Sequence, residues 1–80
     1  MRRMPSSEKR IRQRLAMNVR RLRQERALTL EEASDRAGMY LRHFQKIEAG
    51  DVNATLHTLD RLAEGFGVDV TELFAQNQNS

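Results

Sequence analysis

Cysteine is absent from this chain of 80 residues, histidine occurs only twice, and no long apolar run is present. Without cysteine the chain can form neither disulfides nor thiolate metal sites, which suits a reducing cytoplasm. Its apolar runs fall well short of the ~18 residues of a membrane span, and its Arg-rich start lacks the apolar core of a signal peptide. The sequence therefore predicts a soluble, cytoplasmic protein with no membrane segment.

Sites for chemistry are equally scarce. His43 and His57 do not stand at a spacing typical of metal ligands. The serines and threonines have no arranged base near them in the sequence, and no glycine-rich phosphate loop follows a strand. We therefore expect no enzymatic activity, no metal and no cofactor.

The positive charge is concentrated at one end of the chain. Residues 1–26 hold ten Lys and Arg against two Glu, a net charge of +8, whereas residues 27–80 hold four against nine acids, a net charge of −5. A basic segment of this kind suits contact with phosphates, because neutralised phosphates release counterions. The alternative is a solvated, charge-rich helix face.

Helical spacing dominates the pattern, and we predict five helices. The first runs from about 7 to 26 on an apolar stripe with spacings of four, four and three residues, namely Ile11, Leu15, Val19 and Leu22. The second begins near Leu30, because Thr29 and Glu32 form a capping box, and it stops at Gly38.

Three more helices follow. The third covers about 41–49 and is ended by Gly50. The fourth begins after Asn53 as its N-cap, is closed by Gly65 and Gly67, and carries an apolar stripe of Leu56, Leu59, Leu62, Ala63 and Phe66. The fifth is short, is capped by Asp69, and holds Val70, Leu73 and Phe74. The predicted organisation is a flexible basic arm at 1–6, one domain at 7–75 and a polar tail at 76–80.

The second and third segments have the pattern of a helix-turn-helix. Ala33 and Ala37 are small enough to let two helices approach closely, and Gly38 suits the left-handed turn between them. The third segment has one apolar stripe, Phe44 and Ile47, and a polar opposite face with Arg42, Gln45 and Lys46. Such an exposed cationic helix face is what a reader of the DNA major groove requires.

Several fragments occur in a fixed order: Val19-Arg20-x-Leu22-Arg23, Leu28-Thr29-x-Glu31-Glu32, Ala37-Gly38, Ile47-Glu48-x-Gly50, Leu59-x-x-Leu62-Ala63-x-x-Phe66-Gly67-Val68 and Glu72-Leu73-Phe74. Together they resemble the helix-turn-helix family of phage repressor and Cro proteins, often called the XRE family. The resemblance implies an all-α fold, a compact five-helix bundle of the lambda-repressor-like type with a central helix-turn-helix. It also implies double-stranded DNA as a partner.

Within that family the third helix enters the major groove. The resemblance implies base-reading roles for Leu41, Arg42 and Lys46, flanked by Tyr40, His43 and Gln45. Arg42 is the strongest candidate, because a guanidinium can donate two parallel hydrogen bonds to guanine O6 and N7. The alternative is that Leu41 packs in the core and Lys46 is merely solvated.

The resemblance also implies contacts to the DNA backbone. These contacts involve amide groups at the start of the second helix, near Thr29 and Leu30, and amides in the loop from Gly50 to Asn53. The chain departs from the family by having Leu30 in place of a common glutamine, Tyr40 in place of a small hydroxyl residue, and Ala54 in place of a frequent proline. Tyr40 can still donate from its hydroxyl, whereas Asp51 adds a negative charge to the loop.

Two further roles follow from the resemblance and from the apolar residues. The family pattern implies an ion pair between Arg23 and Glu48, against the alternative of two exposed charges. A dimer is expected because one reading helix touches few base pairs. Apolar residues near the end of the chain, Phe66, Val70 and Phe74, are the candidate dimer interface, against the alternative that all three are core.

Three functions remain open from the sequence. The layout is similar to that of restriction-modification controller proteins, compact phage repressors and DNA-binding antitoxins. The leading expectation is a sequence-specific regulator, an autoregulatory repressor or activator, that binds a palindromic operator as a homodimer. The alternatives are an antitoxin with a toxin partner and a protein-interaction module on a helix-turn-helix scaffold, the latter suggested by Leu30, Tyr40 and Asp51.

Overall fold

The computed structural model describes residues 7–76, so the predicted arm at 1–6 and residues 77–80 of the predicted tail lie outside the described residues. Within this range four α-helices, α1 (Ser7–Glu25), α2 (Leu30–Ala37), α3 (Leu41–Glu48) and α4 (Leu56–Phe66), precede a 3-10 helix, η1 (Val70–Phe74). The same range contains no strand, so the all-α prediction is confirmed for it. The fifth predicted helix is a 3-10 helix rather than an α-helix, so the detail of a five-helix bundle is not confirmed.

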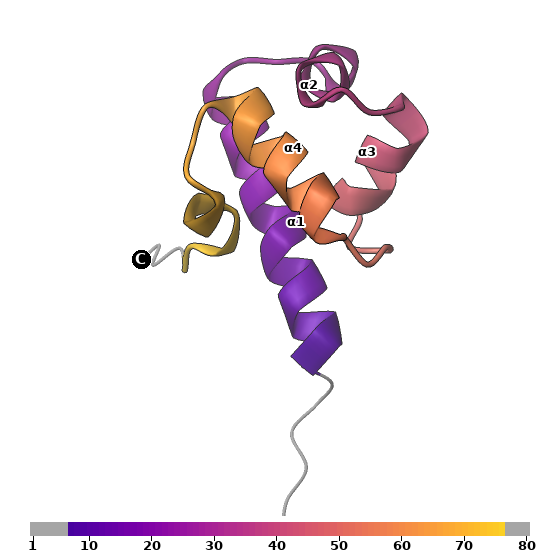
Figure 1. Ribbon diagram of the computed structural model, residues 1–80, viewed down its shortest axis with the longest axis vertical. Helices are drawn as coiled ribbons and strands as arrows, with labels where there is room; N and C mark the ends of the chain where they lie inside the picture. The colour runs from indigo at the N-terminus through magenta and orange to yellow at the C-terminus, as the bar shows by residue number, and fades with distance from the viewer. Residues whose placement is uncertain (1–6, 77–80) are drawn as a thin grey trace, which may run out of the picture.

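Helix α1 is the axis of the fold (Figure 1). The other elements gather around its C-terminal part, while its first turns project beyond them. The core lies between the helices and includes the fully buried side chains of Val19, Phe44, Ile47, Leu62 and Leu73. The projection of α1 explains why Ile11, a member of the predicted apolar stripe, is 54% exposed.

The turn between α2 and α3 is built as predicted. Thr29 and Glu32 form a reciprocal capping box at the start of α2. Gly38 ends this helix in the left-handed conformation with φ 65°, where a residue without Cβ is least strained. Arg61 of α4 donates to the carbonyl oxygens of Ala37 and Gly38, so α4 holds the end of α2 in place.

Helix α4 departs from the prediction in three ways. Its N-cap is Thr55, whose hydroxyl accepts from the Thr58 amide, rather than Asn53. Leu56 is therefore in the first turn and is 84% exposed instead of buried. Gly65 does not end the helix, because α4 continues to Phe66. A Cβ on Gly65 would lie 2.9 Å from the Ala37 nitrogen, so this glycine permits α2 to approach closely.

The last segment is held to α1 by Asn18, which is buried. The Asn18 side-chain amide donates to the carbonyl oxygens of Leu73 and Ala75 at 3.1 Å and 2.9 Å. These side-chain hydrogen bonds occupy the carbonyls at the end of η1, and Glu72 N to Asp69 O follows the 3-10 spacing. A segment of only five residues is therefore stabilised by α1 in a tighter helix than predicted.

Candidate nucleic-acid interface

Helix α3 has one buried face and one free face. Phe44, Ile47 and Glu48 are buried against the rest of the molecule. At about 100° per residue, Arg42 and Lys46 lie on the opposite side of the helix. Both side chains are exposed, and within residues 7–76 neither has a hydrogen-bond or ion-pair partner. Their donors are free to bind a ligand in solvent.

The first turn of α3 continues this face. Tyr40 is 86% exposed and, as the N-cap, makes no side-chain capping hydrogen bond. With His43 it lines a shallow hollow that also contains Arg42 and Lys46. Leu41 is half-buried outside the core cluster, and Gln45 is exposed. The structure thus brings Arg42, His43 and Lys46 together around one hollow, whereas Leu41 and Gln45 do not line it.

The start of α2 offers less to a phosphate than predicted. The Thr29 amide donates to the Glu32 carboxylate, so it is already satisfied. Leu30 packs against the core and its side chain has no polar atom. Glu31 and Glu32 both lie in the first turn, where the helix dipole stabilises their negative charges. These charges repel an anion.

The loop between α3 and α4, residues 49–55, also differs from the prediction. The Gly50 amide donates to Ile47 O and the Asp51 amide to Lys46 O, both at 3.0 Å. These two amides therefore close the end of α3 and are not free for a phosphate, which corrects the role assigned to the Gly50 amide. The Asn53 side chain is exposed, and its Oδ1 accepts from Arg12 at 3.1 Å.

Three arginines of α1 connect this helix to the end of α3 and to the loop. Arg12 Nε donates to Gly50 O at 3.3 Å, and Arg20 Nη2 donates to Glu48 O at 2.8 Å. The expected ion pair between Arg23 and Glu48 is present in the structure, with Nε–Oε2 and Nη2–Oε1 distances of 2.6 Å and 3.2 Å. Hydrogen bonding to the Glu48 carboxylate raises the pKa of Arg23. The reading helix is therefore anchored at its C-terminal end.

Sequence reasoning missed the contacts of Arg12 and Arg20. Both residues lie in the basic stretch that predicts phosphate contacts or a solvated face, and the sequence does not say which arginines turn inward. The spacing of residues 12, 20 and 23 places these three arginines on one side of an α-helix. This shared side was the sequence signal that could have indicated their common contacts.

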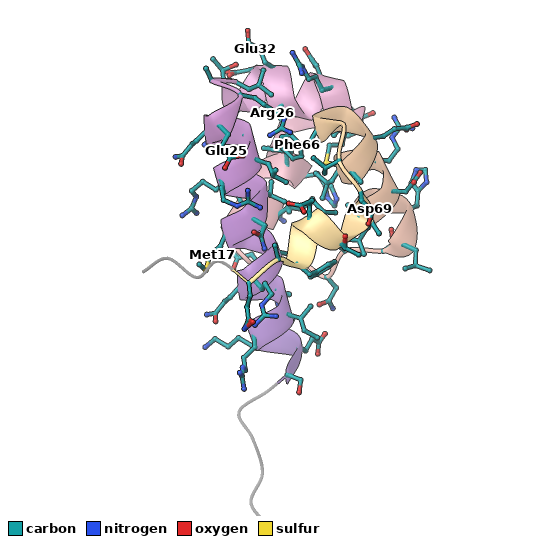
Figure 2. The ribbon with its side chains drawn as sticks, turned by 90° about the vertical axis from the view of Figure 1, so that its left-hand side faces the viewer. Met17, Glu25, Arg26, Glu32, Phe66 and Asp69 are labelled. Atoms are coloured by element: carbon teal, nitrogen blue, oxygen red, sulfur yellow. The ribbon has the colours of Figure 1, made fainter. Side chains whose placement is uncertain are left out.

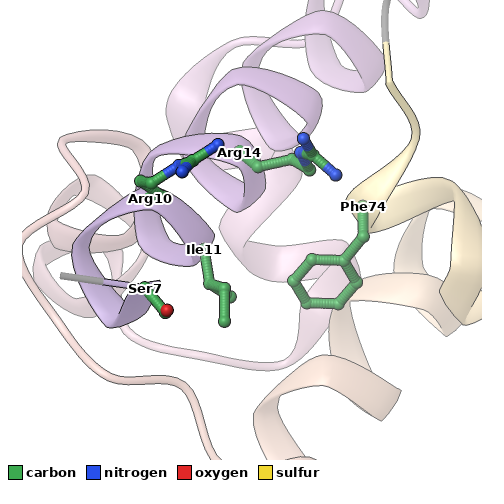
Figure 3. Close-up of a pocket in the computed structure, with 5 residues that line it drawn as sticks. All are labelled: Ser7, Arg10, Ile11, Arg14 and Phe74. Atoms are coloured by element: carbon green, nitrogen blue, oxygen red, sulfur yellow. The ribbon is translucent and has the colours of Figure 1, made fainter. Parts of the chain in front are cut away.

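The residues predicted for the dimer interface do not form one surface. Phe66 is only 6% exposed and belongs to the core, with Arg26 over its ring at 5.7 Å (Figure 2). It is therefore unavailable to a second chain. Val70 is 42% exposed, and Phe74 lines a groove with Ile11, bordered by Arg10 and Arg14 (Figure 3).

Comparison with known proteins places these features in context. A family model described as a helix-turn-helix domain matches residues 14–75. The chain belongs to this helix-turn-helix family. A relative named as an uncharacterized HTH-type transcriptional regulator, y4dJ of Sinorhizobium fredii, is 41% identical over 56 residues, which are 70% of this chain and 73% of the relative.

Solved structures share the fold at 24% sequence identity. An HTH_3 family transcriptional regulator from Vibrio cholerae superposes with a TM-score of 0.84 over 89% of this chain, which spans 40% of that protein. A hypothetical transcription factor from Neisseria gives 0.82 over 98% of this chain and 88% of its own. The restriction-modification controller protein C.AhdI from Aeromonas hydrophila gives 0.76, with coverages of 79% and 96%.

The predicted resemblance to a helix-turn-helix family is thus confirmed. Two negative observations apply to residues 7–76 alone. None of their helices has the length and apolar character needed to span a bilayer. Nor does that stretch contain a group of three or more His, Asp and Glu side chains placed to hold a metal ion.

Proposed function

We propose that this chain is a sequence-specific transcriptional regulator that reads an operator through the free face of α3. The observation that carries the proposal is the pair of unpartnered cations, Arg42 and Lys46, opposite the buried stripe of the same helix. Arg42 supplies a bidentate contact to guanine, and Lys46 binds a second guanine or a phosphate. Gln45, Leu41, Tyr40 and His43 flank these contacts.

We also propose that two copies bind a palindromic operator. A dimer places two reading helices about one helical turn of DNA apart, roughly 34 Å, and doubles the number of base contacts. The exposed Val70 and Ile11, with the half-buried Phe74, supply apolar surface away from α3 for this contact. The operator lies upstream of the gene itself, so the regulator controls its own synthesis. The fold shared with a restriction-modification controller supports this compact arrangement.

The DNA-binding test uses the protein's own upstream DNA and a scrambled duplex of equal length. Each is titrated at two salt concentrations. We expect preferential binding to the upstream DNA, with two subunits per site at saturation. Arg42→Ala should reduce this preference by about 5- to 150-fold, the equivalent of one bidentate base contact. Equal binding to both duplexes, with a steep salt dependence, would contradict sequence reading.

A matched control comes from Arg10, another exposed arginine without a partner among the described residues. Arg10→Ala removes the same charge from α1, on the side that faces Phe74 rather than α3. It should leave the preference for the upstream DNA intact. A similar loss of preference in both variants would mean that general charge, not base reading, is responsible.

The dimer is tested by light scattering after gel filtration. Val70→Lys places a charge on the proposed interface at a position that is already 42% exposed, so folding should be maintained. We expect this variant to shift toward the monomer. Tyr40→Lys, which changes the 86% exposed N-cap residue of α3, is the control and should leave the molar mass unchanged. A monomeric wild type at micromolar concentration would refute the interface.

One feature favours a second function, a protein-interaction module. Tyr40 exposes an aromatic ring, and an exposed Tyr is typical of protein-binding hot spots. If Arg42→Ala and Lys46→Ala leave the biological function intact, this candidate replaces the regulator. A gene for a toxin next to this one would make the partner a toxin.

A further inference from the structure

We propose that Arg12 is a positioning residue for DNA binding, which holds the loop of residues 49–55 so that the Asn53 side-chain nitrogen contacts a backbone phosphate. The proposal rests on the proposed function, since it assigns one phosphate contact of the same complex. Its basis is a pair of hydrogen bonds that the Arg12 guanidinium donates to the loop, called the fork below. Nε donates to Gly50 O at 3.3 Å, while Nη1 donates to Asn53 Oδ1 at 3.1 Å.

The fork fixes both the backbone and a side chain of the loop. Gly50 lies over α1, where an added Cβ would be 3.8 Å from Arg12 O and 3.9 Å from the Ala16 Cβ. The guanidinium of Arg12 is also placed by Glu8, whose carboxylate lies 3.5 Å from Nη1. Arg12 thus joins the projecting part of α1 to the loop that follows the reading helix.

The orientation of the Asn53 amide follows from this contact. An asparagine amide has one accepting oxygen and one donating nitrogen. Because Oδ1 accepts from Arg12, the nitrogen is left for another partner, and within residues 7–76 it donates to no group. The side chain is exposed, so Nδ2 is available to an acceptor outside the chain.

Two other donors of the same loop are already used. The Gly50 and Asp51 amides are used to close α3, and the Asp51 carboxylate is exposed and repels phosphate. Asn53 Nδ2 is therefore a neutral donor, held at a defined position, through which the loop can bind the backbone. Hydrogen bonds from Asn to phosphate oxygens position a protein on DNA without reading sequence.

A double-mutant cycle on operator affinity tests the coupling. Asn53→Ala and Arg12→Lys should each weaken binding by about 3- to 10-fold, the equivalent of one hydrogen bond. Lysine retains the charge but lacks the fork that reaches Gly50 and Asn53 together. The operator affinity of the double variant should equal that of the single variant with the lower affinity, because both changes remove the same contact. If the fold losses of affinity in the two single variants instead multiply in the double variant, the proposal is overturned.

Arg20 provides the matched control. It also lies on α1 and donates to a backbone carbonyl at the end of α3, yet it makes no contact with Asn53. Arg20→Lys combined with Asn53→Ala should give multiplied effects. If Arg20 couples to Asn53 as strongly as Arg12 does, α1 merely supports α3 as a whole and Arg12 has no separate positioning role.

Salt dependence separates positioning from a direct ionic contact. If Arg12 itself bound a phosphate, Arg12→Gln would lower the slope of log affinity against log salt by about 0.9. We expect the slope to be unchanged, because the substitution disturbs only the hydrogen bond from the neutral Asn53 amide to the phosphate. A wild type that shows no operator preference would refute the proposed function and this inference together, whereas a normal wild type with multiplied effects would refute only the inference.

Discussion

The ion pair between Arg23 and Glu48 should be a major determinant of stability, and Glu48→Ala tests this. Glu48 is 7% exposed and the Arg23 side chain 17% exposed, so the substitution leaves a largely buried guanidinium without its carboxylate. Breaking a buried pair in this way costs about 3–5 kcal/mol. Arg23 keeps its hydrogen bond to Leu28 O, so we expect the lower end of the range, about 3 kcal/mol.

Thermal unfolding followed by circular dichroism measures the effect. In a domain of this size each kcal/mol shifts Tm by about 4–8 °C, so the Tm should fall by about 12–24 °C. Glu25→Ala is the control, because it removes a glutamate that is 53% exposed and pairs with Arg21 at 3.2 Å. Such a surface pair contributes about 0.5 kcal/mol or less.

The two variants together decide whether the buried pair has a special contribution. If Glu48→Ala unfolds at the same temperature as Glu25→Ala, the buried pair makes no special contribution to stability and the reasoning is refuted. Below its Tm, Glu48→Ala should still prefer the operator, since Glu48 is buried and touches no DNA in the proposed complex. Loss of preference in the fully folded variant would instead show that the pair positions α3.

Three further predictions concern other elements. Gly65→Ala should lower stability by about 1–3 kcal/mol in urea unfolding despite its better helix propensity, because the new Cβ would lie 2.9 Å from the Ala37 nitrogen; a stabilised variant would contradict this close contact. Asp51→Asn should raise affinity for operator and scrambled DNA alike, by about 2- to 5-fold at low salt, because it removes an exposed negative charge from the loop; unchanged titrations would place the loop away from DNA. Hydrogen bonds from Thr71 lower the pKa of Asp69, the N-cap of η1. The Asp69 carboxylate therefore stabilises η1 above the unfolded pKa of about 3.9, and this stabilisation is lost as the pH falls through the lower folded value. Asp69→Asn should weaken the fall of Tm in that acid range, and identical acid profiles of variant and wild type would count against the capping role of Asp69.

Several features were determined by the sequence itself because they depend on residues close together along the chain. The capping box of Thr29 and the left-handed Gly38 are local, so their residue types suffice to predict the turn before α3. The spacing of Phe44 and Ile47 likewise predicts which side of α3 is buried, and thereby which side exposes Arg42. Charge placement and the family resemblance then indicate DNA.

The tertiary structure decided which surfaces are covered and which donors are already used. Periodicity identifies an apolar stripe without showing where the covering helices end, so Ile11 belongs to the stripe and is still exposed, because α1 projects beyond its neighbours. The close approach of α2 gives Gly65 its role, and Asn18 holds the last segment against α1. Arg12 reaches the loop 38 residues away. Such contacts depend on the packing of distant segments, which no local pattern specifies.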